Sequence, residues 1–139
     1  MKFLKIIILL FTIAFSSTKL AAQQKEEQII KAVSFETDKI ILNNKIAYNY
    51  IKEGNRFTIL SLDKQELIKG EISSLGNGKF SSLITFVKSG KQFSNEKIIG
   101  RNDLIFAFAG ENVINEDFTI NEVKLDAFIK KYNQLQTKS

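Results

Sequence analysis

The sequence predicts a β-rich α+β domain, in which an antiparallel meander of about five or six strands is followed by one short helix and a C-terminal amphipathic helix. Three observations predict it. Short alternating or β-branched segments recur between residues 39 and 94. Tight-turn signals such as Asn43-Asn44 and Gly76-Asn77-Gly78 separate them. After Gly100 the apolar spacing becomes typical of helices.

The strands are expected at regular, short intervals, as in a meander. In 45–51 the alternation places Ile46, Tyr48 and Tyr50 on one face. Gly70 lies inside a strand, where glycine marks a bulge or a close approach of another group. Before the first strand, residues 23–28 are polar and indicate a flexible lead-in, with room for one helical turn that reaches Lys31. The predicted strands are 39–42, 45–51, 56–62, 67–73, 79–87 and 92–94.

Two segments favour helices. Residues 103–109 are almost continuously apolar and fit a short helix or a buried strand, and a cap at Asn102 with a terminator at Gly110 favours the helix. The final helix begins after a cap at Asn121, and Lys130 and Lys131 near its end suit the helix dipole. Its Leu125, Phe128 and Tyr132 face is expected to pack on the sheet or an edge. Its apolar positions are Val123, Leu125, Phe128, Ile129 and Tyr132.

Residues 1–22 have the three parts of a secretory signal. Lys2 and Lys5 give a positive start, residues 6–15 an uncharged apolar middle, and Ala21-Ala22 a small-residue end. The apolar run is shorter than the roughly 20 residues of a membrane span. We predict cleavage between Ala22 and Gln23, which leaves a single periplasmic or secreted domain, residues 23–139, without a membrane span. An uncleaved signal anchor and a buried core helix are the alternatives.

The charge balance excludes some partners. The chain has 20 basic and 15 acidic residues, and the signal holds three of the basic ones, Lys2, Lys5 and Lys19, so the mature domain carries a net charge of only +2. Its lysines are scattered among acids, whereas nucleic-acid binding proteins carry a concentrated basic excess. We therefore expect no nucleic-acid partner and a solvated surface of mixed charge.

The absence of His and Cys removes most site chemistry. Zinc sites with nitrogen or sulfur ligands, haem ligation and His-assisted Ser or Cys nucleophiles all need one of these residues. Without Cys no disulfide can form. We predict no cofactor and no metal, and a protein that is not an enzyme.

Residues 115–121 share features with half of an EF-hand calcium loop. Val113 would occupy the first ligand position, and Lys124 would stand where a bidentate Glu belongs. A cation site with Lys as its main ligand is not credible, so this segment is predicted to be a turn before a capped helix.

The remaining polar candidates lack a catalytic pattern. Four serines sit outside any nucleophile-elbow motif and are expected to face solvent. Six acids lie in the meander and most of them flank turns; their spacing picks out no pair, so they are expected on the surface. The serines are Ser73, Ser74, Ser81 and Ser82, and the acids are Glu36, Asp38, Glu53, Asp63, Glu66 and Glu71.

Aromatic residues give the candidates for ligand binding. Tyr48, Tyr50 and Phe57 could line a pocket or a partner surface. The same residues also fit the core of a one-sided sheet, which is the more common role of such a stripe.

The hairpin segment LNNKIAYNYIKEGNRFTILSLDKQELIKGEI, followed by GRNDLIFAF and LDAFIKKYN, resembles small exported bacterial β-meander proteins of unknown function. The resemblance covers most of the mature chain and rests on turn and packing motifs. It supports the layout of strands and helices, and it implies no activity.

Three functions are compatible with these patterns. The missing catalytic residues and the export signal favour a non-enzymatic exported domain that contacts an envelope or extracellular protein. A small ligand-binding half-barrel that uses the Tyr and Phe face is the alternative, and it requires a cavity of several hundred Å³. A carboxylate hydrolase would need two acids that face one cleft.

Overall fold

The computed structural model describes residues 26–135. The predicted signal peptide and its cleavage site between Ala22 and Gln23 lie outside the described residues. Between residues 26 and 135 the chain forms seven strands and two helices, which confirms the predicted β-rich α+β class. Neither described helix is long and apolar enough to span a membrane.

Each strand pairs antiparallel with its neighbour in the chain, in the order β1 to β7, so the sheet is the predicted meander. The expectation of five or six strands missed β1, because its four residues give the alternation only two cycles. Strand β1 pairs along its whole length with β2, from Val33 opposite Leu42 to Glu36 opposite Lys39. The strands are β1 Val33–Glu36, β2 Lys39–Leu42, β3 Lys45–Glu53, β4 Arg56–Leu60, β5 Glu66–Gly76, β6 Lys79–Phe86 and β7 Gln92–Phe93.

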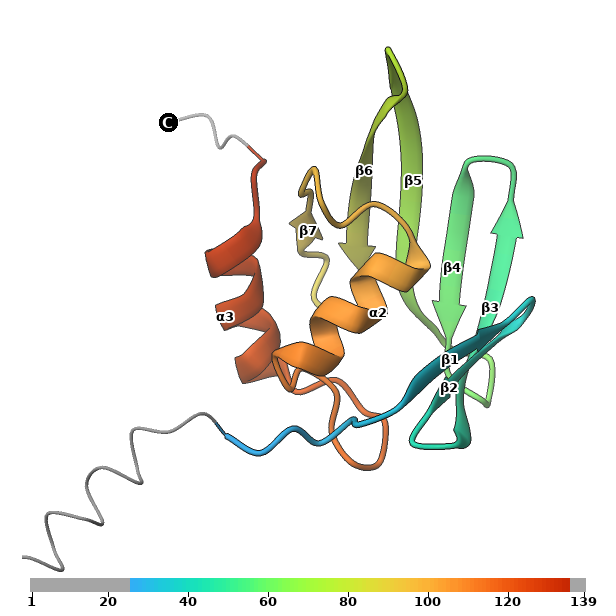
Figure 1. The fold of residues 1–139 in the computed structure, drawn as a ribbon, viewed down its shortest axis with the longest axis vertical. Coiled ribbons are helices and arrows are strands. Elements are labelled where there is room, and N and C mark those ends of the chain that lie inside the picture. Colours follow the sequence, from blue (N-terminus) through green and yellow to red (C-terminus); the bar gives the residue numbers. More distant parts are fainter. Residues whose placement is uncertain (1–25, 136–139) are drawn as a thin grey trace, which may run out of the picture.

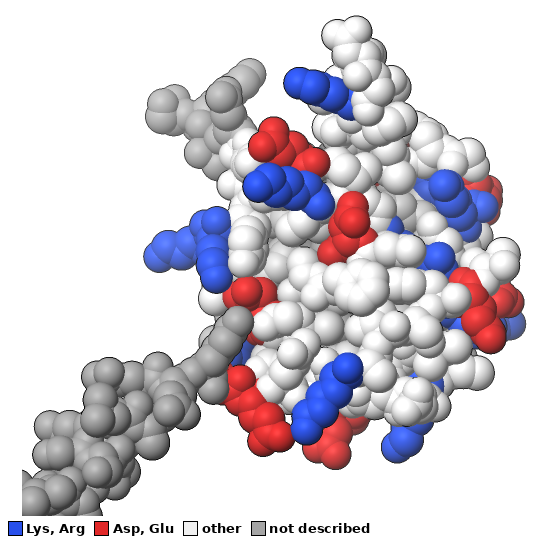
Figure 2. All heavy atoms as spheres, in the orientation of Figure 1, with Lys and Arg blue, Asp and Glu red and all other residues white. Residues whose placement is uncertain are grey.

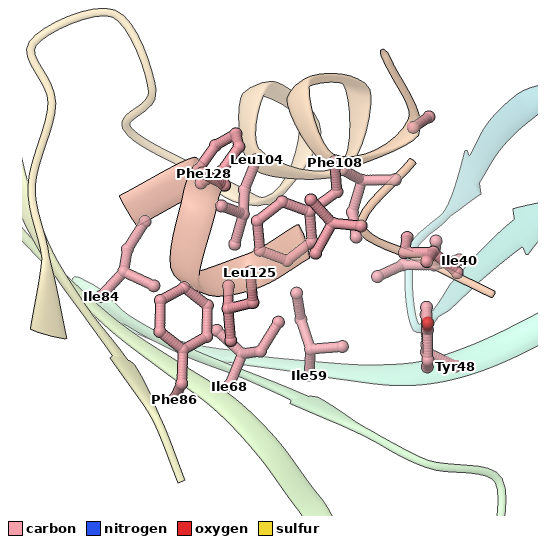
Figure 3. Close-up of a cluster of buried hydrophobic side chains, with 14 of the residues drawn as sticks. Ile40, Tyr48, Ile59, Ile68, Ile84, Phe86, Leu104, Phe108, Leu125 and Phe128 are labelled. Atoms are coloured by element: carbon pink, nitrogen blue, oxygen red, sulfur yellow. The ribbon is translucent and has the colours of Figure 1, made fainter. Parts of the chain in front are cut away.

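The sheet curls around two helices, α2 (Arg101–Gly110) and α3 (Glu122–Tyr132) (Figure 1). The core lies between the helices and the sheet, and the close-up in Figure 3 shows helix side chains facing sheet side chains. Phe108 of α2 and Phe128 of α3 meet edge to face, with ring centroids 5.0 Å apart. Phe108 also stacks on Phe86 of β6 at 5.9 Å. The aromatic rings thus join both helices to the sheet.

Residues 101–110 form the helix α2, so the buried-strand alternative for 103–109 is wrong. The predicted cap at Asn102 is also wrong, because the helix begins after Gly100, whose lack of a side chain leaves no cap bond. The helix ends at Gly110 as predicted, and the left-handed residue that closes it is Asn112, whose φ is 56°. The following Val113 N–H donates to the Phe108 carbonyl at 3.0 Å, which closes the helix end as a Schellman motif.

Helix α3 begins as predicted, because the Asn121 side chain accepts a hydrogen bond from the Lys124 N–H at 3.1 Å. Leu125 and Phe128 are buried, and Phe128 lies 5.3 Å from Phe93 of β7 between ring centroids, so this face packs on the sheet. Val123 was predicted on the same apolar face, yet it is 79% exposed. Its position in the first turn of the helix therefore faces away from the core.

The chain before β1 is held in place rather than forming the predicted helical turn. Residues 26–32 contain no helix, and Ile30 among them is 1% exposed. The Asn112 side chain accepts from the Ile29 N–H at 2.9 Å and donates to the Glu27 carbonyl at 3.1 Å. The Asn43 side chain accepts from the Lys31 N–H at 2.7 Å and donates to the Ile29 carbonyl at 3.0 Å. Two asparagines therefore fix this segment from both sides.

Asn43 and Asn44 form the predicted turn between β2 and β3 and allow a matched test. Both residues have left-handed backbones, with φ of 51° and 64°, which a glycine adopts without strain. We expect Asn43→Gly to lower the free energy of unfolding by about 1–2 kcal/mol, because several hydrogen bonds of about 0.5–1.5 kcal/mol each are lost. Asn44→Gly should leave it unchanged or slightly higher. Urea unfolding of both variants checks this, and equal effects would contradict the bonding role of Asn43.

The surface carries the expected mixture of charges, and Figure 2 shows basic and acidic side chains interspersed on one face. All six acids of the meander that were expected on the surface are exposed. Ion pairs such as Arg56–Glu71 at 3.3 Å join exposed side chains, and such pairs contribute roughly 0–1 kcal/mol each. Packing and backbone hydrogen bonds therefore hold the fold.

Candidate functional site

A pocket of about 690 Å³ lies at one end of the sheet. We call it the bulge pocket. Its inner lining is mostly apolar, and its charged groups are three carboxylates and one lysine. The apolar and aromatic lining residues are Ala47, Tyr48, Leu62, Leu67, Ile68, Phe86, Phe118, Ile120 and Leu125. The polar ones are Ser61, Asp63, Gln65, Lys88, Asp117, Thr119 and Glu122.

Two β-bulges shape this pocket. Between β2 and β3, Ile40 pairs with Tyr48 and Ile41 with Ile46, so Ala47 is an extra residue. Between β4 and β5, Ile59 pairs with Ile68 and Leu60 with Glu66, so Leu67 is an extra residue. Both extra residues line the pocket. Bulges bend a strand and redirect its side chains, and they are common beside functional sites.

The first bulge corrects the predicted face of β3. Alternation placed Ile46 beside Tyr48, but the extra residue between them turns Ile46 outward, where it is 48% exposed. Ala47 and Tyr48 are instead buried as neighbours, at 3% and 2% exposure. A smooth strand could not bury two consecutive residues on one side of the sheet.

A tight turn between α2 and α3 closes one side of the pocket. The Phe118 N–H donates to the Asn115 carbonyl at 2.9 Å, and the Asn115 N–H donates to the Thr119 carbonyl at 2.8 Å. Phe118 has a left-handed backbone with φ of 70°, a strained conformation for a bulky residue. The Tyr48 hydroxyl donates to the Phe118 carbonyl at 2.6 Å and fixes this turn against β3.

Asp117 brings negative charge to the same turn. Its Oδ1 atom accepts hydrogen bonds from the Thr119 N–H at 3.1 Å and the Thr119 hydroxyl at 2.5 Å. These bonds, the hydroxyl first, hold the pKa of the Asp117 carboxyl below its usual value. Burial, and to a lesser degree the Asp117 charge, raises the pKa of Tyr48. The pocket thus keeps an ionised carboxylate close to a neutral phenol at neutral pH.

The raised pKa of Tyr48 predicts a loss of stability in alkali. A tyrosine whose pKa is higher in the folded state than its unfolded value of about 10 contributes its full stabilisation of the folded state below pH ~10. This stabilisation is lost as the pH rises toward the folded-state pKa. Above pH ~10, we expect the unfolding free energy of the wild type to fall more steeply than that of Tyr48→Phe, by up to about 1.4 kcal/mol per pH unit. Urea midpoints measured across this range test it, and parallel slopes would contradict it.

The structure separates the three aromatic candidates. Tyr48 lines the bulge pocket. Tyr50 lies outside it, with the Arg101 guanidinium 4.1 Å from its ring centroid. Phe57 is 2% exposed and packs beside Tyr50, with ring centroids 6.1 Å apart. Only one of the three therefore faces the cavity, and the other two support the core and the surface next to it.

Sequence reasoning missed most of the pocket. Leu67 and Ile68 were assigned to a strand and Leu125 to a helix face, with no indication that they converge. The signal that was available is the polar segment 115–121, which was predicted to be a turn and was not linked to a pocket. It forms the predicted turn before the Asn121 cap, and its Asp117, Phe118 and Thr119 line the cavity.

The other polar candidates lie apart from this pocket, except for Asp63 on its edge. Ser73, Ser74 and Ser81 are exposed or half-buried in strands, as predicted. Ser82 is wrongly predicted to face solvent, because it is 3% exposed and donates to the Ile98 carbonyl at 3.2 Å. Within residues 26–135 no group of three or more Asp or Glu side chains is arranged to hold a metal ion.

Comparison of the chain with protein-family models, with curated proteins and with solved structures finds no match. Only the sequence and the geometry of the structure therefore bear on its function.

Proposed function

We propose that this protein binds a small, largely apolar molecule in the bulge pocket, and that it does so outside the cytoplasm. The observation that carries the proposal is the cavity of about 690 Å³ with a mostly apolar lining. Ligand sites generally measure about 300–1,000 Å³, are mainly apolar and contain a few polar groups. The signal-like pattern of residues 1–22 supports the location.

Binding without turnover fits the residues around the cavity. The chain has no His or Cys, and among the described contacts the pocket hydroxyls of Ser61 and Thr119 donate to carboxylates rather than to a lysine base. A carboxylate hydrolase needs a general acid that stays protonated at neutral pH. The lowered pKa of Asp117 opposes that role for this carboxyl.

Titration with Nile red, a neutral dye that fluoresces in apolar surroundings, tests the proposal. The chain contains no Trp, so Leu62→Trp at the exposed edge of the pocket adds a single indole reporter. We expect one equivalent of dye to bind and to quench this indole by energy transfer more strongly than it quenches the indole of Ile51→Trp. Ile51 is 48% exposed on the other face of β3 and serves as the matched control.

A blocking variant completes the test. Ala47→Phe should fill the cavity and weaken dye binding at least tenfold, while the cooperative unfolding transition is kept. If this variant fails to fold, Leu67→Phe, at the half-buried residue of the second bulge, replaces it. Unchanged dye affinity in a folded blocking variant would refute binding in this pocket.

Contact with a protein partner is the second candidate, and an exposed aromatic patch favours it. Phe106 is 57% exposed and meets Phe35 edge to face at 5.6 Å. The Arg101 guanidinium lies 4.7 Å from the Phe35 ring centroid and 4.1 Å from that of Tyr50. Aromatic and Arg side chains are enriched at the centres of protein interfaces.

A pull-down from the cell envelope tests the second candidate. The wild type should retain a partner that Phe106→Ser loses. Val123→Ser, at a residue that is 79% exposed on α3, is the matched control and should retain it. Recovery of the same proteins by all three would count against a role for the aromatic patch.

A further inference from the structure

Three aromatic rings line the bulge pocket together with its carboxylates, and this combination restricts the ligand. Tyr48, Phe86 and Phe118 contribute the rings. Tyr48 and Phe118 meet at an interplanar angle of 61°, with centroids 6.4 Å apart, so they form two sides of a corner. Aromatic rings set at an angle to one another bind quaternary ammonium groups, because the negative faces of the rings attract a cation.

The charge at this corner also favours a cation. Asp117 precedes Phe118 in the chain, and its charge acts on the Tyr48 hydroxyl. Both hydrogen bonds from Thr119 reach Oδ1, and within residues 26–135 no hydrogen bond occupies Oδ2. The carboxylate is thus oriented on one side and open on the other.

The pocket as a whole also carries a net negative charge. Its charged lining residues are Asp63, Asp117 and Glu122 against Lys88. The positive end of the α3 dipole lies beside Glu122, its first residue, and offsets about half a charge. The balance stays negative, so an anionic ligand such as a fatty acid would be repelled, whereas an ammonium group would be attracted.

We infer that the bulge pocket binds a freely diffusing amphiphile that carries an ammonium group, with the ammonium in the corner formed by the Tyr48 and Phe118 rings, beside Asp117. The hydrocarbon part of the ligand lies against the aliphatic lining, which includes Leu67, Ile68 and Leu125. This inference rests on the proposed function and specifies the ligand class for the same site.

Three probes with one shared hydrocarbon chain test the inference by isothermal titration calorimetry at low salt. The first ends in trimethylammonium, the second in its neutral tert-butyl isostere, and the third in a carboxylate. We expect the ammonium probe to bind about tenfold more tightly than the isostere, since a cation–π contact and a nearby carboxylate together contribute that much. The carboxylate probe should bind most weakly.

Variants test whether the corner formed by the Tyr48 and Phe118 rings causes the preference for the ammonium probe over its isostere. Phe118→Leu and Asp117→Asn should each weaken binding of the ammonium probe about threefold to tenfold and change the affinity for the isostere less than twofold. Lys88→Gln is the matched control: it removes the positive charge of the pocket and should strengthen binding of the ammonium probe.

The outcomes separate the two proposals. Equal affinity for the ammonium probe and its isostere, or tightest binding of the carboxylate probe, would overturn the ligand class while leaving an apolar site. Failure of all three probes, together with failure of Nile red, would overturn the bulge pocket as a binding site. If Phe118→Leu or Asp117→Asn does not fold, Thr119→Val, which removes one bond that orients Asp117, provides the same comparison.

Discussion

Replacing Phe128 with alanine is expected to lower the free energy of unfolding by about 3–5 kcal/mol, the usual cost of removing a buried aromatic ring. The ring is 2% exposed, and it contacts aromatic rings from three elements. Its centroid lies 5.3 Å from that of Phe93, 5.0 Å from that of Phe108 and 4.9 Å from that of Tyr132. Since this ring joins α3 to both α2 and β7, little of the cavity can close by local rearrangement.

Equilibrium unfolding in urea measures this loss, and Val123→Ala is the matched control. Val123 lies on the same helix and is 79% exposed, so its truncation should change the unfolding free energy by less than about 0.5 kcal/mol. A small domain has only about 5–15 kcal/mol of total stability, so Phe128→Ala should move the midpoint far toward zero denaturant. A loss below about 1 kcal/mol would show that α3 is not part of the cooperative core.

Replacing Gly70 with valine is expected to destabilise the protein by about 2–3 kcal/mol, near the upper part of the range for overpacked cores. Gly70 lies directly opposite Phe57 in the β4–β5 ladder. A Cβ atom on Gly70 would come within 2.2 Å of two carbons of the Phe57 ring. Because that ring is 2% exposed and packed beside Tyr50, it has little free space to occupy.

A double-mutant cycle tests whether the clash is the cause. In a Phe57→Leu background the same Gly70→Val change should cost at least 1 kcal/mol less, since coupling between touching residues is commonly about 0.5–3 kcal/mol. Gly100→Ala is the control: a Cβ there meets nothing within 4 Å, and its φ of −109° suits any residue. Additive effects of the two substitutions would rule out the ring as the cause of the loss.

The strand layout could be predicted because local residues decide it. The turns contain residues that adopt left-handed backbones easily, as at Asn43-Asn44 and at Asn77, whose φ is 55°. Gly70 was predicted to mark a bulge or a close approach, and the structure shows the close approach of Phe57. The strand β1 was missed because its pairing with β2, rather than its own four residues, stabilises it.

The pocket could not be predicted from the sequence, since it depends on single-residue shifts in pairing. Nothing in the local sequence marks Ala47 or Leu67 as an extra residue, so the alternation pattern predicts regular strands without a bulge at both positions. The turn that closes the pocket was missed for a related reason. Its left-handed position holds Phe118 rather than glycine, and the bond from Tyr48 that stabilises it comes from a residue 70 positions away.

The asparagine bonds that hold residues 26–32 have a consequence for the order of folding. All of the strand pairs join neighbours in the chain, so the meander closes short loops and should form early. The bonds from Asn112 to Glu27 and Ile29 close loops of more than 80 residues, and they need the end of α2 to exist first. The contacts of Glu27 and Ile29 with Asn112 are therefore expected to be among the last to form, and substitutions of Asn112 should speed unfolding more than they slow folding.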